Sequence, residues 1–271
     1  MQGKIVKIIS DDHFVDIKTD TIICKARGKF RKDNASFKVG DQVIINEKEK
    51  VIEKLLPRKN QLDRPVVSNI DEAFIITSLK DPNFNTNLLD KLLTVCEINK
   101  IKPVICLTKK DLLSKDEYKK LKPVIKYYKK MYKVIYNTQI FKIKKMFKNK
   151  TIVFTGQTGA GKSSLINNLD KSLNFETNEI SKALGRGKHT TRYVTLVPLY
   201  KGFVLDTPGF SAISLENYTD EQIKDSFIEF NKYNCPYKDC NHINEKDCNI
   251  RGNKNILKSR YENYVKFIEK R

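Results

Sequence analysis

The sequence predicts a multi-domain chain: a small N-terminal β-barrel, a central α/β domain and a C-terminal helical domain that carries a cluster of potential metal ligands. Three observations support this prediction. Short strands separated by turn residues fill the first 56 residues, apolar strands alternate with helical segments from 66 to about 215, and three cysteines and a histidine gather near the C-terminus. We expect the domain boundaries at residues 1–62, 63–215 and 216–271.

The N-terminal region has the strand spacing of a small barrel of the oligonucleotide-binding type. We expect strands over 4–9, 13–17, 21–24 and 42–45, with a turn at Gly40-Asp41 before the last. A basic stretch follows the third strand and suggests contact with nucleic acid; it consists of Lys25, Arg27, Lys29, Arg31 and Lys32. The proline-bounded segment 57–65 is typical of a linker.

A glycine-rich loop follows the β-branched run 151–155 and precedes an expected helix over 164–169. In such a loop, backbone N–H groups turn inward around phosphates, Lys162 meets the β/γ oxygens and the Ser163 hydroxyl can bind Mg²⁺. A glycine-rich structural turn is the alternative, but the strand and helix on either side favour a nucleotide site. The predicted nucleotide-binding residues of this segment are Gly156, Gln157, Thr158, Gly159, Ala160, Gly161, Lys162, Ser163 and Ser164.

Two further segments complete a guanine nucleotide site. Thr108-Lys109-Lys110-Asp111 follows the apolar strand 104–107, and the Asp111 carboxylate can accept hydrogen bonds from guanine N1 and N2. Asp206-Thr207-Pro208-Gly209 follows the apolar strand 202–205, so Asp206 can reach Mg²⁺ through water and the Gly209 amide can contact a γ-phosphate. Taken singly, the first could be a solvated lysine-rich turn and the second a common turn.

The order of these segments is unusual. In an ordinary GTPase the phosphate loop comes first and the guanine-reading Lys-x-Asp comes late, whereas here residues 108–111 precede residues 156–163. The order therefore predicts a circularly permuted nucleotide domain.

A basic loop over 184–192 lies between the phosphate loop and Asp206 and has the character of a first switch. Thr190 or Thr191 could complete the Mg²⁺ shell, and His189 could order the attacking water or simply contact a phosphate or RNA. An exposed basic loop is the alternative. Phe210 follows Gly209 where many switch GTPases have a water-orienting glutamine, so we expect slow intrinsic hydrolysis.

The second strong cluster of chemistry-bearing residues lies near the C-terminus: Cys235, Cys240, His242 and Cys248. Three thiolates and one imidazole in fourteen residues suit a closed tetrahedral Zn²⁺ site, and the metal would fold a segment too short to have its own core. Disulfide pairing fits this set poorly. The other three cysteines stand singly in apolar segments, and we expect each to be a buried small hydrophobe: Cys24, Cys96 and Cys106.

The charge balance favours a polyanionic partner. The net charge is +20, from 52 Lys and Arg against 32 Asp and Glu, although lysine enrichment can also give an ordinary solvated surface. The sequence has no N-terminal apolar signal and no apolar run that could span a bilayer. Because the cysteine pattern also suits a metal site, we expect a protein of the reducing cytoplasm. We expect it to bind no membrane and to be a monomer.

These motifs together resemble the ribosome small-subunit-dependent GTPase A family, a bacterial group of circularly permuted GTPases. The resemblance extends over the barrel signature 24–32, the opening 69–71 of the GTPase domain, the first switch 185–191 and the cysteine-histidine spacing. Thr108 is a departure, because the family usually has Asn there. We expect guanine selection to depend on Lys109 and Asp111; the remaining base-contact loop, near Tyr136-Asn137-Thr138, is left unassigned.

The resemblance implies a Mg²⁺-dependent GTPase that binds the small (30S) ribosomal subunit and its rRNA, acts in late maturation, and leaves after hydrolysis to GDP and phosphate. A permuted GTPase that acts on another RNA or on the large subunit is one alternative. The other is a non-enzymatic RNA-binding protein that only senses GTP; the presence of Lys162, Ser163 and Asp206 argues for turnover.

Overall fold

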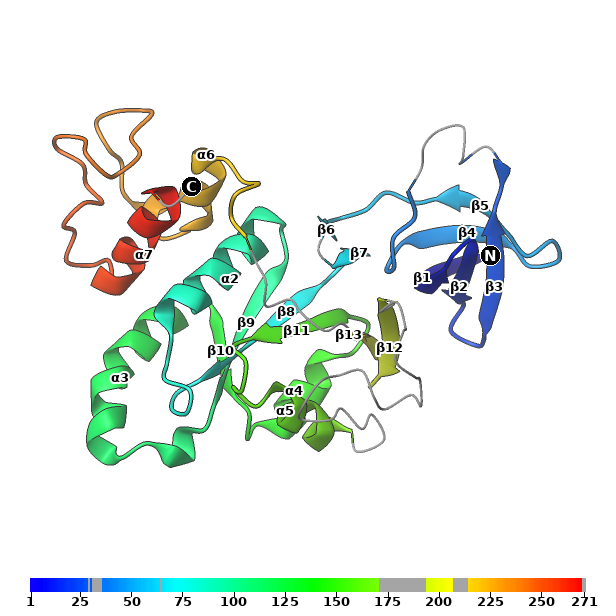
Figure 1. The fold of residues 1–271 in the computed structure, drawn as a ribbon, viewed down its shortest axis with the longest axis horizontal. Helices are drawn as coiled ribbons and strands as arrows, with labels where there is room; N and C mark the ends of the chain where they lie inside the picture. Colours follow the sequence, from blue (N-terminus) through cyan, green and yellow to red (C-terminus); the bar gives the residue numbers. More distant parts are fainter. Residues whose placement is uncertain (29, 31–35, 64, 171–193, 207–213, 270–271) are drawn as a thin grey trace. The chain divides into compact units, whose positions relative to one another are not determined.

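Five short strands close into a barrel at the N-terminus of the computed structural model, which describes residues 1–28, 30, 36–63, 65–170, 194–206 and 214–269 (Figure 1). The chain forms two compact units. The first contains residues 1–72, 140–154 and 163–210, and the second contains residues 73–139, 155–162 and 211–271. The barrel belongs to the first unit, and its strands are β1 (Gln2–Ile9), β2 (Asp12–Asp16), β3 (Thr21–Ala26), β4 (Gln42–Asn46) and β5 (Val51–Leu55).

Backbone pairing closes this barrel in the order β1-β2-β3-β5-β4, with β4 returning to β1. The β3–β5 pair is parallel and the other pairs are antiparallel. Alternate residues point inward, as the period of a strand requires, and the core includes Ile5, Val15, Val43 and Ile52. The predicted barrel is confirmed, with one strand more than the sequence indicated, because Glu53 and Lys54 interrupt the apolar pattern of β5.

The segment 57–65 was predicted to be a linker, and this prediction is wrong for its second half. Strand β6 (Gln61–Asp63) pairs with β7 (Val66–Ser68) in a small antiparallel sheet. The first half is also fixed, because the Arg58 guanidinium donates to both oxygens of the fully buried Asp41 carboxylate at 2.6 and 2.8 Å. Composition marked this segment as irregular, but a buried carboxylate needs a partner, and Arg58 supplies it.

The rest of the first unit holds the strands on either side of the phosphate loop. Strand β11 (Thr151–Gly156), whose last two residues belong to the second unit, runs parallel to β13 (Gly202–Asp206), and β12 (Thr195–Leu199) pairs antiparallel with β13. Two short helices, α4 (Ile140–Met146) and α5 (Lys162–Leu169), precede and follow β11. Val153 lies opposite Leu205, the residue before Asp206.

The second unit contains the strand order β10-β9-β8 (Figure 1). Its strands are β8 (Glu72–Ser78), β9 (Lys102–Thr108) and β10 (Lys133–Tyr136), and every residue of β8 is buried. Helix α2 (Thr86–Ile98) follows β8, and a 3-10 turn, η1 (Lys110–Leu112), leads to α3 (Lys115–Lys129). A capping box between Ser114 and Glu117 fixes the start of α3 directly after the predicted guanine-reading loop.

Three short helical elements form the C-terminal part of the second unit: α6 (Asp220–Ser226), the 3-10 turn η3 (Phe230–Lys232) and α7 (Lys258–Glu269). The helical character predicted for the C-terminal domain is confirmed by α6 and α7. Helix α2 packs against both α6 and α7. Cys24, Cys96 and Cys106 are buried in β3, α2 and β9, as expected.

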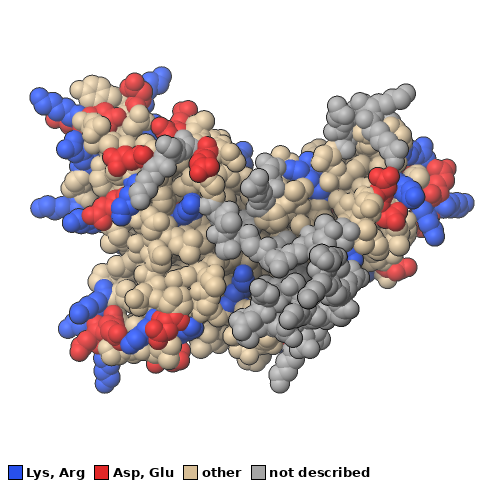
Figure 2. All heavy atoms as spheres, in the orientation of Figure 1, with Lys and Arg blue, Asp and Glu red and all other residues tan. Residues whose placement is uncertain are grey.

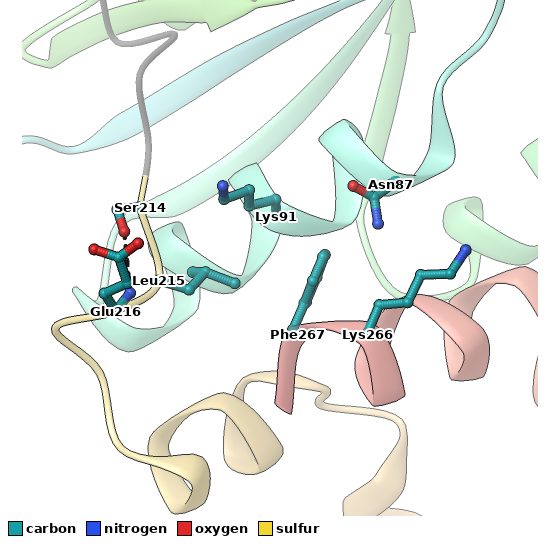
Figure 3. A pocket seen from close by; sticks show the side chains of 7 residues that line it. All are labelled: Asn87, Lys91, Ser214, Leu215, Glu216, Lys266 and Phe267. Atoms are coloured by element: carbon teal, nitrogen blue, oxygen red, sulfur yellow. Dashed lines mark hydrogen bonds between the residues drawn. The ribbon is translucent and has the colours of Figure 1, made fainter. Parts of the chain in front are cut away.

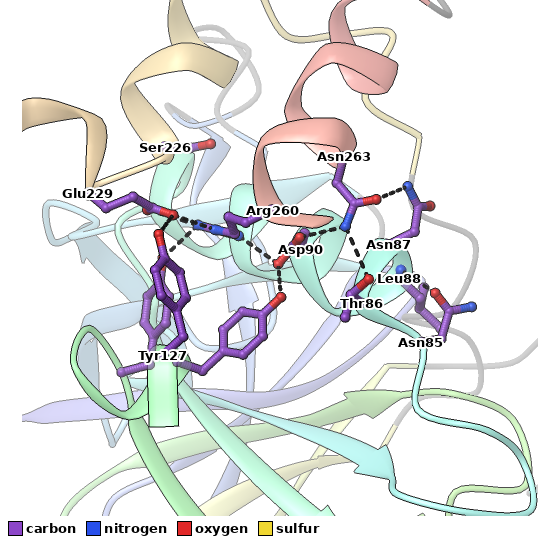
Figure 4. A network of polar contacts seen from close by, with 12 residues as sticks. Asn85, Thr86, Asn87, Leu88, Asp90, Tyr127, Ser226, Glu229, Arg260 and Asn263 are labelled. Atoms are coloured by element: carbon purple, nitrogen blue, oxygen red, sulfur yellow. Dashed lines mark hydrogen bonds and ion pairs between the residues drawn. The ribbon is translucent and has the colours of Figure 1, made fainter. Parts of the chain in front are cut away.

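A buried charge network joins α7 to α2 (Figure 4). Arg260 is fully buried; its guanidinium donates to Asp90 at 2.8 Å and to Glu229 at 2.8 Å. Asn263 and Tyr128 donate to the two oxygens of the same Asp90 carboxylate at 2.7 and 2.6 Å. Burial opposes the charge of Arg260, but the neighbouring acidic groups outweigh it and hold its pKa well above the usual range. The C-terminal segment is therefore fixed to α2 by charges that have no access to water.

Charge of both signs is mixed over the visible surface of the described residues (Figure 2). Lysine and arginine side chains stand among carboxylates there, so the net charge of +20 does not by itself mark an interface. Among the helices described, none has the length and apolarity that crossing a membrane requires.

Candidate nucleotide site and metal centre

The phosphate loop begins where β11 meets β8. At Gly156 the backbone φ is +139°, and a Cβ there would lie 2.0 Å from the Ile76 carbonyl oxygen. The next residue, Gln157, donates its backbone N–H to that same carbonyl at 3.3 Å. Only glycine fits such a close approach with a positive φ, so the local packing of the strands, rather than a bound anion, fixes where the loop starts.

The loop then turns into helix α5. Gly159 and Gly161 have φ values of +75° and +90°, and Lys162 is the first residue of the helix. Burial lowers the pKa of Lys162, so its ammonium has lost part of its hydration. Ser163 and Ser164 follow in the first turn, and Thr158 lies in the turn itself. A cation that is partly desolvated at a helix start is suited to receive a phosphate.

Thr108 connects the guanine-reading segment to the phosphate loop. It is the last residue of β9, it is buried, and its hydroxyl donates to the Ala160 carbonyl at 2.6 Å. The predicted departure from the family's usual Asn thus leaves a short side chain that still reaches the phosphate loop. The hydrogen bond holds two loops together that are 52 residues apart in the sequence.

The next three residues form the exposed end of this segment. Lys109 has a left-handed backbone, with φ +55°, and its ammonium donates to the Asp81 carbonyl. Lys110 lies over the rings of Tyr118 and Tyr136, at 4.7 and 5.2 Å from their centroids. Asp111 lies in η1 and is exposed. A carboxylate with free access to solvent at this position is available to a planar base.

The loop after β10 lies beside this segment. The Asn137 backbone N–H donates to the Leu107 carbonyl at 3.0 Å, and the Gln139 side chain accepts from the Tyr136 backbone at 3.1 Å. The sequence left the last base-contact loop unassigned near these residues, and the Asn137 contact lies on β9, the strand that leads into the predicted guanine-reading segment.

Several predicted residues are only partly placed. Asp206 ends β13, directly after Leu205, the residue opposite Val153 of β11. His189, Thr190 and Thr191 of the predicted first switch, and Gly209 and Phe210 of the second, lie outside the described residues.

The four predicted metal ligands come together in the C-terminal segment. The donor atoms of Cys235, Cys240, His242 and Cys248 all lie within 4.8 Å of one another. The Sγ atoms of Cys235 and Cys248 are 3.8 Å apart, and each lies 3.4 Å from His242 Nδ1. A tetrahedral Zn²⁺ with Zn–S bonds of about 2.3 Å and Zn–N bonds of about 2.0–2.1 Å requires S···S and S···N separations of about 3.8 and 3.6 Å. The donor set and its spacing fit zinc.

The surroundings of this cluster hold the ligands in place. The hydroxyls of Tyr261 and Tyr264 on α7 donate to the carbonyls of His242 and Asn241 at 2.8 and 2.5 Å. The Arg251 backbone N–H points at Cys248 Sγ at 3.4 Å, the kind of contact that favours a thiolate. Burial raises the pKa of the Cys240 thiol to about 12, so this thiol would ionise only beside a strong positive charge such as a metal ion.

A cavity of about 180 Å³ lies between α2, α7 and the segment that follows residues 207–213 (Figure 3). It is lined by Leu215 and Glu216 of that segment, by Lys91 of α2 and by Lys266 and Phe267 of α7. The segment after the predicted second switch therefore reaches the C-terminal helices directly.

Comparison with known proteins identifies the family. The RsgA GTPase model matches residues 55–216, and the RsgA N-terminal domain model matches residues 2–51. Small ribosomal subunit biogenesis GTPase RsgA of Pediococcus pentosaceus is 40% identical over 98% of this chain and 92% of its own length. The RsgA of Caldanaerobacter subterraneus is 42% identical over 92% of this chain and 88% of its own length. The chain belongs to the RsgA GTPase family.

Solved structures agree with this membership. YjeQ from Thermotoga maritima superposes with a TM-score of 0.86 at 32% identity, covering 99% of this chain and 97% of its own. YloQ, described as a circularly permuted GTPase, superposes with a TM-score of 0.84 at 31% identity, covering 99% and 94%. The predicted circular permutation and the three-part fold are confirmed, and so is the prediction of a GTP-hydrolysing enzyme.

The sequence analysis missed one loop that contacts the predicted nucleotide-binding residues of this RsgA-family chain. Two carbonyls of the loop after β8 accept hydrogen bonds. The Asp81 carbonyl accepts from the Lys109 ammonium, and the Asn83 carbonyl accepts from the Gln157 side-chain amide at 3.4 Å. Its Lys80 ammonium binds both oxygens of Glu117, the capping residue of α3, at 2.9 and 3.0 Å. The available signal was positional: a buried strand followed by Asp-Pro-Asn ends near the other two loops.

Proposed function

We propose that this protein is a Mg²⁺-dependent GTPase that binds the small ribosomal subunit during its late maturation and leaves after hydrolysis. The observation that carries the proposal is the near-complete alignment with relatives named small ribosomal subunit biogenesis GTPase, together with a phosphate loop already tied to the guanine-reading segment. An isolated nucleotide motif would support only GTP binding; a match over the barrel as well supports the whole ribosomal assignment.

The nucleotide would be held by residues with separate tasks. Asp111 would accept guanine N1 and N2, which excludes adenine, and Lys109 would cover the base. Lys162 would meet the β/γ phosphates, where its partly desolvated charge gains most from an anion. Ser163 and Asp206, with Thr190 or Thr191, would complete the Mg²⁺ shell, the metal neutralising charge on the transferred phosphoryl group.

The hydrolytic step needs a group that orders water. Phe210 follows Gly209 and can neither donate to nor accept from water, so slow turnover by the protein alone is part of the proposal. His189 is the proposed catalytic residue, and a group of the ribosome is the alternative. Either way, binding to the subunit would complete the site and raise turnover.

The cysteine-histidine cluster would hold one Zn²⁺ as a structural ion. The four protein donors would fill all four positions of a tetrahedral ion, so the metal would have no open position for a substrate or water. Its role would be to shape the loop between η3 and α7, which has little core of its own. That loop would present a surface to rRNA.

The GTP state would be communicated to the subunit through the C-terminal helices. Because of the permutation, the second switch continues into Leu215 and Glu216, which line the cavity against α2 and α7 (Figure 3). A rearrangement of the switch on hydrolysis would change the packing at this cavity. Nucleotides can shift subunit binding only through such a difference between two states.

The proposed setting is the bacterial cytoplasm, with the protein as a monomer. All six cysteines are unpaired thiols in the structure, which suits a reducing compartment. Size-exclusion chromatography with light scattering would check the monomeric state.

The experiment that tests the function is phosphate release under multiple turnover with no addition, with purified 30S subunits and with 50S subunits. We expect slow hydrolysis alone, strong stimulation by 30S and little by 50S. A non-hydrolysable GTP analogue should bind the protein to 30S more tightly than GDP does. Equal stimulation by both subunits, or by neither, would contradict the small-subunit assignment.

A further inference from the structure

Helix α4 carries the most exposed large apolar side chain among the described residues. Phe141 is 84% exposed, whereas the other exposed large hydrophobics range from 44% to 57%. The helix is fixed in orientation, because Ile143 and Met146 are buried beneath it and Phe147 packs on the rings of Phe154 and Tyr200. The exposure of Phe141 is therefore set by the fold.

The side chains around Phe141 are lysines. Lys145 follows at the i+4 position, on the same side of the helix as Phe141, and Lys142 is the next residue and exposed. Lys148 is exposed in the turn that directly follows the end of α4 at Met146. Lys201 is included because it is exposed in the β12–β13 turn, and its carbonyl accepts the Asn149 backbone N–H at 2.9 Å, which joins that turn to the segment after α4. We call these five residues the α4 face: Phe141, Lys142, Lys145, Lys148 and Lys201.

No carboxylate of the described residues forms an ion pair with this face. The sequence contains no Asp or Glu between Glu117 and Asp170, and within the described residues no ion pair involves any lysine of the face. The barrel differs, since Arg27 is paired there with Glu49 at 2.6 Å and Glu53 at 3.3 Å. On α4 the positive charge is available to a partner; on that part of the barrel it is largely neutralised.

An exposed ring among uncompensated lysines matches one kind of partner. Phosphates of a flexible strand would meet the ammonium groups, and an unpaired base would stack on the Phe141 ring. A base inside a helical stack cannot do so, which excludes the interior of a duplex. A protein partner would have to bring carboxylates to every lysine and an apolar socket for the ring. From this geometry we infer that the α4 face binds a single-stranded segment of RNA.

The inference rests on the proposed function only for the source of that RNA, an unpaired segment of the small subunit's rRNA. Binding to a plain oligonucleotide does not depend on the ribosome. The two claims can therefore fail separately, and the test has one arm for each.

In the first arm, full-length protein binds a fluorescent single-stranded oligoribonucleotide, with the same sequence in a duplex as comparison. Phe141→Ala should weaken single-strand binding about tenfold, and Phe141→Trp should retain it, since base stacking on an aromatic side chain is worth about 1–3 kcal/mol. Phe141→Leu separates stacking from general apolarity and should behave like Phe141→Ala. Wild-type affinity in Phe141→Leu would overturn the inference.

The contribution of the lysines is tested through the salt dependence of oligonucleotide binding. A triple Ala variant of Lys142, Lys145 and Lys148 should reduce the slope of log K against log salt by about 2, at about 0.7 per phosphate contact in single strands. The matched control removes three exposed lysines from α3: Lys119, Lys120 and Lys126. An equal reduction in both variants would attribute the effect to net charge and overturn the inference.

In the second arm, the same variants are tested for 30S binding and 30S-stimulated hydrolysis, with unchanged basal hydrolysis as the check on folding. We expect Phe141→Ala to weaken 30S binding severalfold, and ultraviolet cross-linking of the wild-type complex to attach rRNA to the α4 peptide. If the wild-type protein neither binds 30S subunits nor is stimulated by them, the proposed function is contradicted. The oligonucleotide measurements of the first arm then still test the RNA-binding inference. Wild-type behaviour of Phe141→Ala in both arms would overturn the inference.

Discussion

The predicted phosphate loop and the cysteine-histidine loop are both short segments with a proposed ion-binding role, but they are held in opposite ways. The phosphate loop is fixed by neutral hydrogen bonds from neighbouring strands: Gln157 to Ile76 and Thr108 to Ala160. The cysteine-histidine loop has its ligand atoms close together and is joined through α7 to a buried charge network around Arg260.

This difference bears on how readily each loop would exchange its ligand, the nucleotide in one case and the metal ion in the other. A loop whose shape is fixed by its framework can release a nucleotide and receive another without unfolding. A loop whose fold depends on a bound metal must retain that metal to stay folded. A rigid attachment through α7 would then fix the position of the loop relative to α2. The four predictions below test this contrast, from the largest expected effect to the smallest.

Metal loss should have the largest effect. Cys240→Ser removes a buried ligand, and structural Zn²⁺ sites in small peptides contribute an apparent 10–16 kcal/mol, on the order of their whole folding energy. We expect zinc content to fall from about one per chain to near zero and protease cleavage to appear between η3 and α7. Nucleotide affinity should change little. The control is Cys106→Ala, a buried cysteine outside the cluster; full zinc retention by Cys240→Ser would contradict the ligand assignment.

The attachment of the C-terminal segment should come next. Arg260→Met leaves the Asp90 and Glu229 carboxylates buried without their cation, and breaking a buried pair in this way typically costs about 3–5 kcal/mol. Urea unfolding would measure the loss. Adding Asp90→Asn and Glu229→Gln should restore part of it, because no unpaired charge then remains. Substitution of the exposed Arg251 by Met is the control. A loss of less than about 1 kcal/mol in the free energy of unfolding of Arg260→Met would show that the network contributes little to stability.

A substitution in the predicted phosphate loop should lower GTP turnover without lowering the stability of the fold. Lys162→Ala removes the charge that would meet the β/γ phosphates, and the loss of one such transition-state contact typically lowers turnover about 10²–10³-fold. Burial lowers the pKa of Lys162, so its charged form is penalised in the free protein and removing it should not destabilise that state. Phosphate release and thermal unfolding without nucleotide would be measured together, with exposed Lys119→Ala as the control. Normal turnover in Lys162→Ala would refute the phosphate-loop assignment.

The sequence predicted best those features whose chemistry is contiguous. Residues 156–163 and the cysteine-histidine spacing are local patterns. The first set forms a turn that leads into α5, and the donor atoms of the second lie within 4.8 Å of one another. Strand β5 and the β6–β7 hairpin were missed because charges and prolines hide a strand that tertiary pairing imposes.

Contacts between distant residues left no local signal at all. Nothing near Arg260 in the sequence marks it as the partner of Asp90, 170 residues away. The exposure of Phe141 also depends on which face of α4 the fold buries, and the sequence of this helix, which contains four apolar residues and three lysines, is equally compatible with a core position for Phe141. The Asp81 and Asn83 carbonyls at the nucleotide site are backbone groups, which residue types cannot indicate.

The smallest predicted effect concerns the link between the two loops of the nucleotide site. Thr108→Val keeps the shape of the side chain but removes the hydroxyl that donates to Ala160 at 2.6 Å, and a buried carbonyl left without its donor typically costs about 1–3 kcal/mol. We expect GTP and GDP affinity to fall about fivefold to tenfold, because the unlinked loops must be ordered by the nucleotide. Thr108→Ser retains the hydroxyl and should bind nearly as the wild type does. Selection of GTP over xanthosine triphosphate should not change in either variant, since Asp111 and not Thr108 would read the base. Titration with fluorescent GDP and GTP measures these affinities; wild-type affinity in Thr108→Val would show that the framework holds the phosphate loop without this bond.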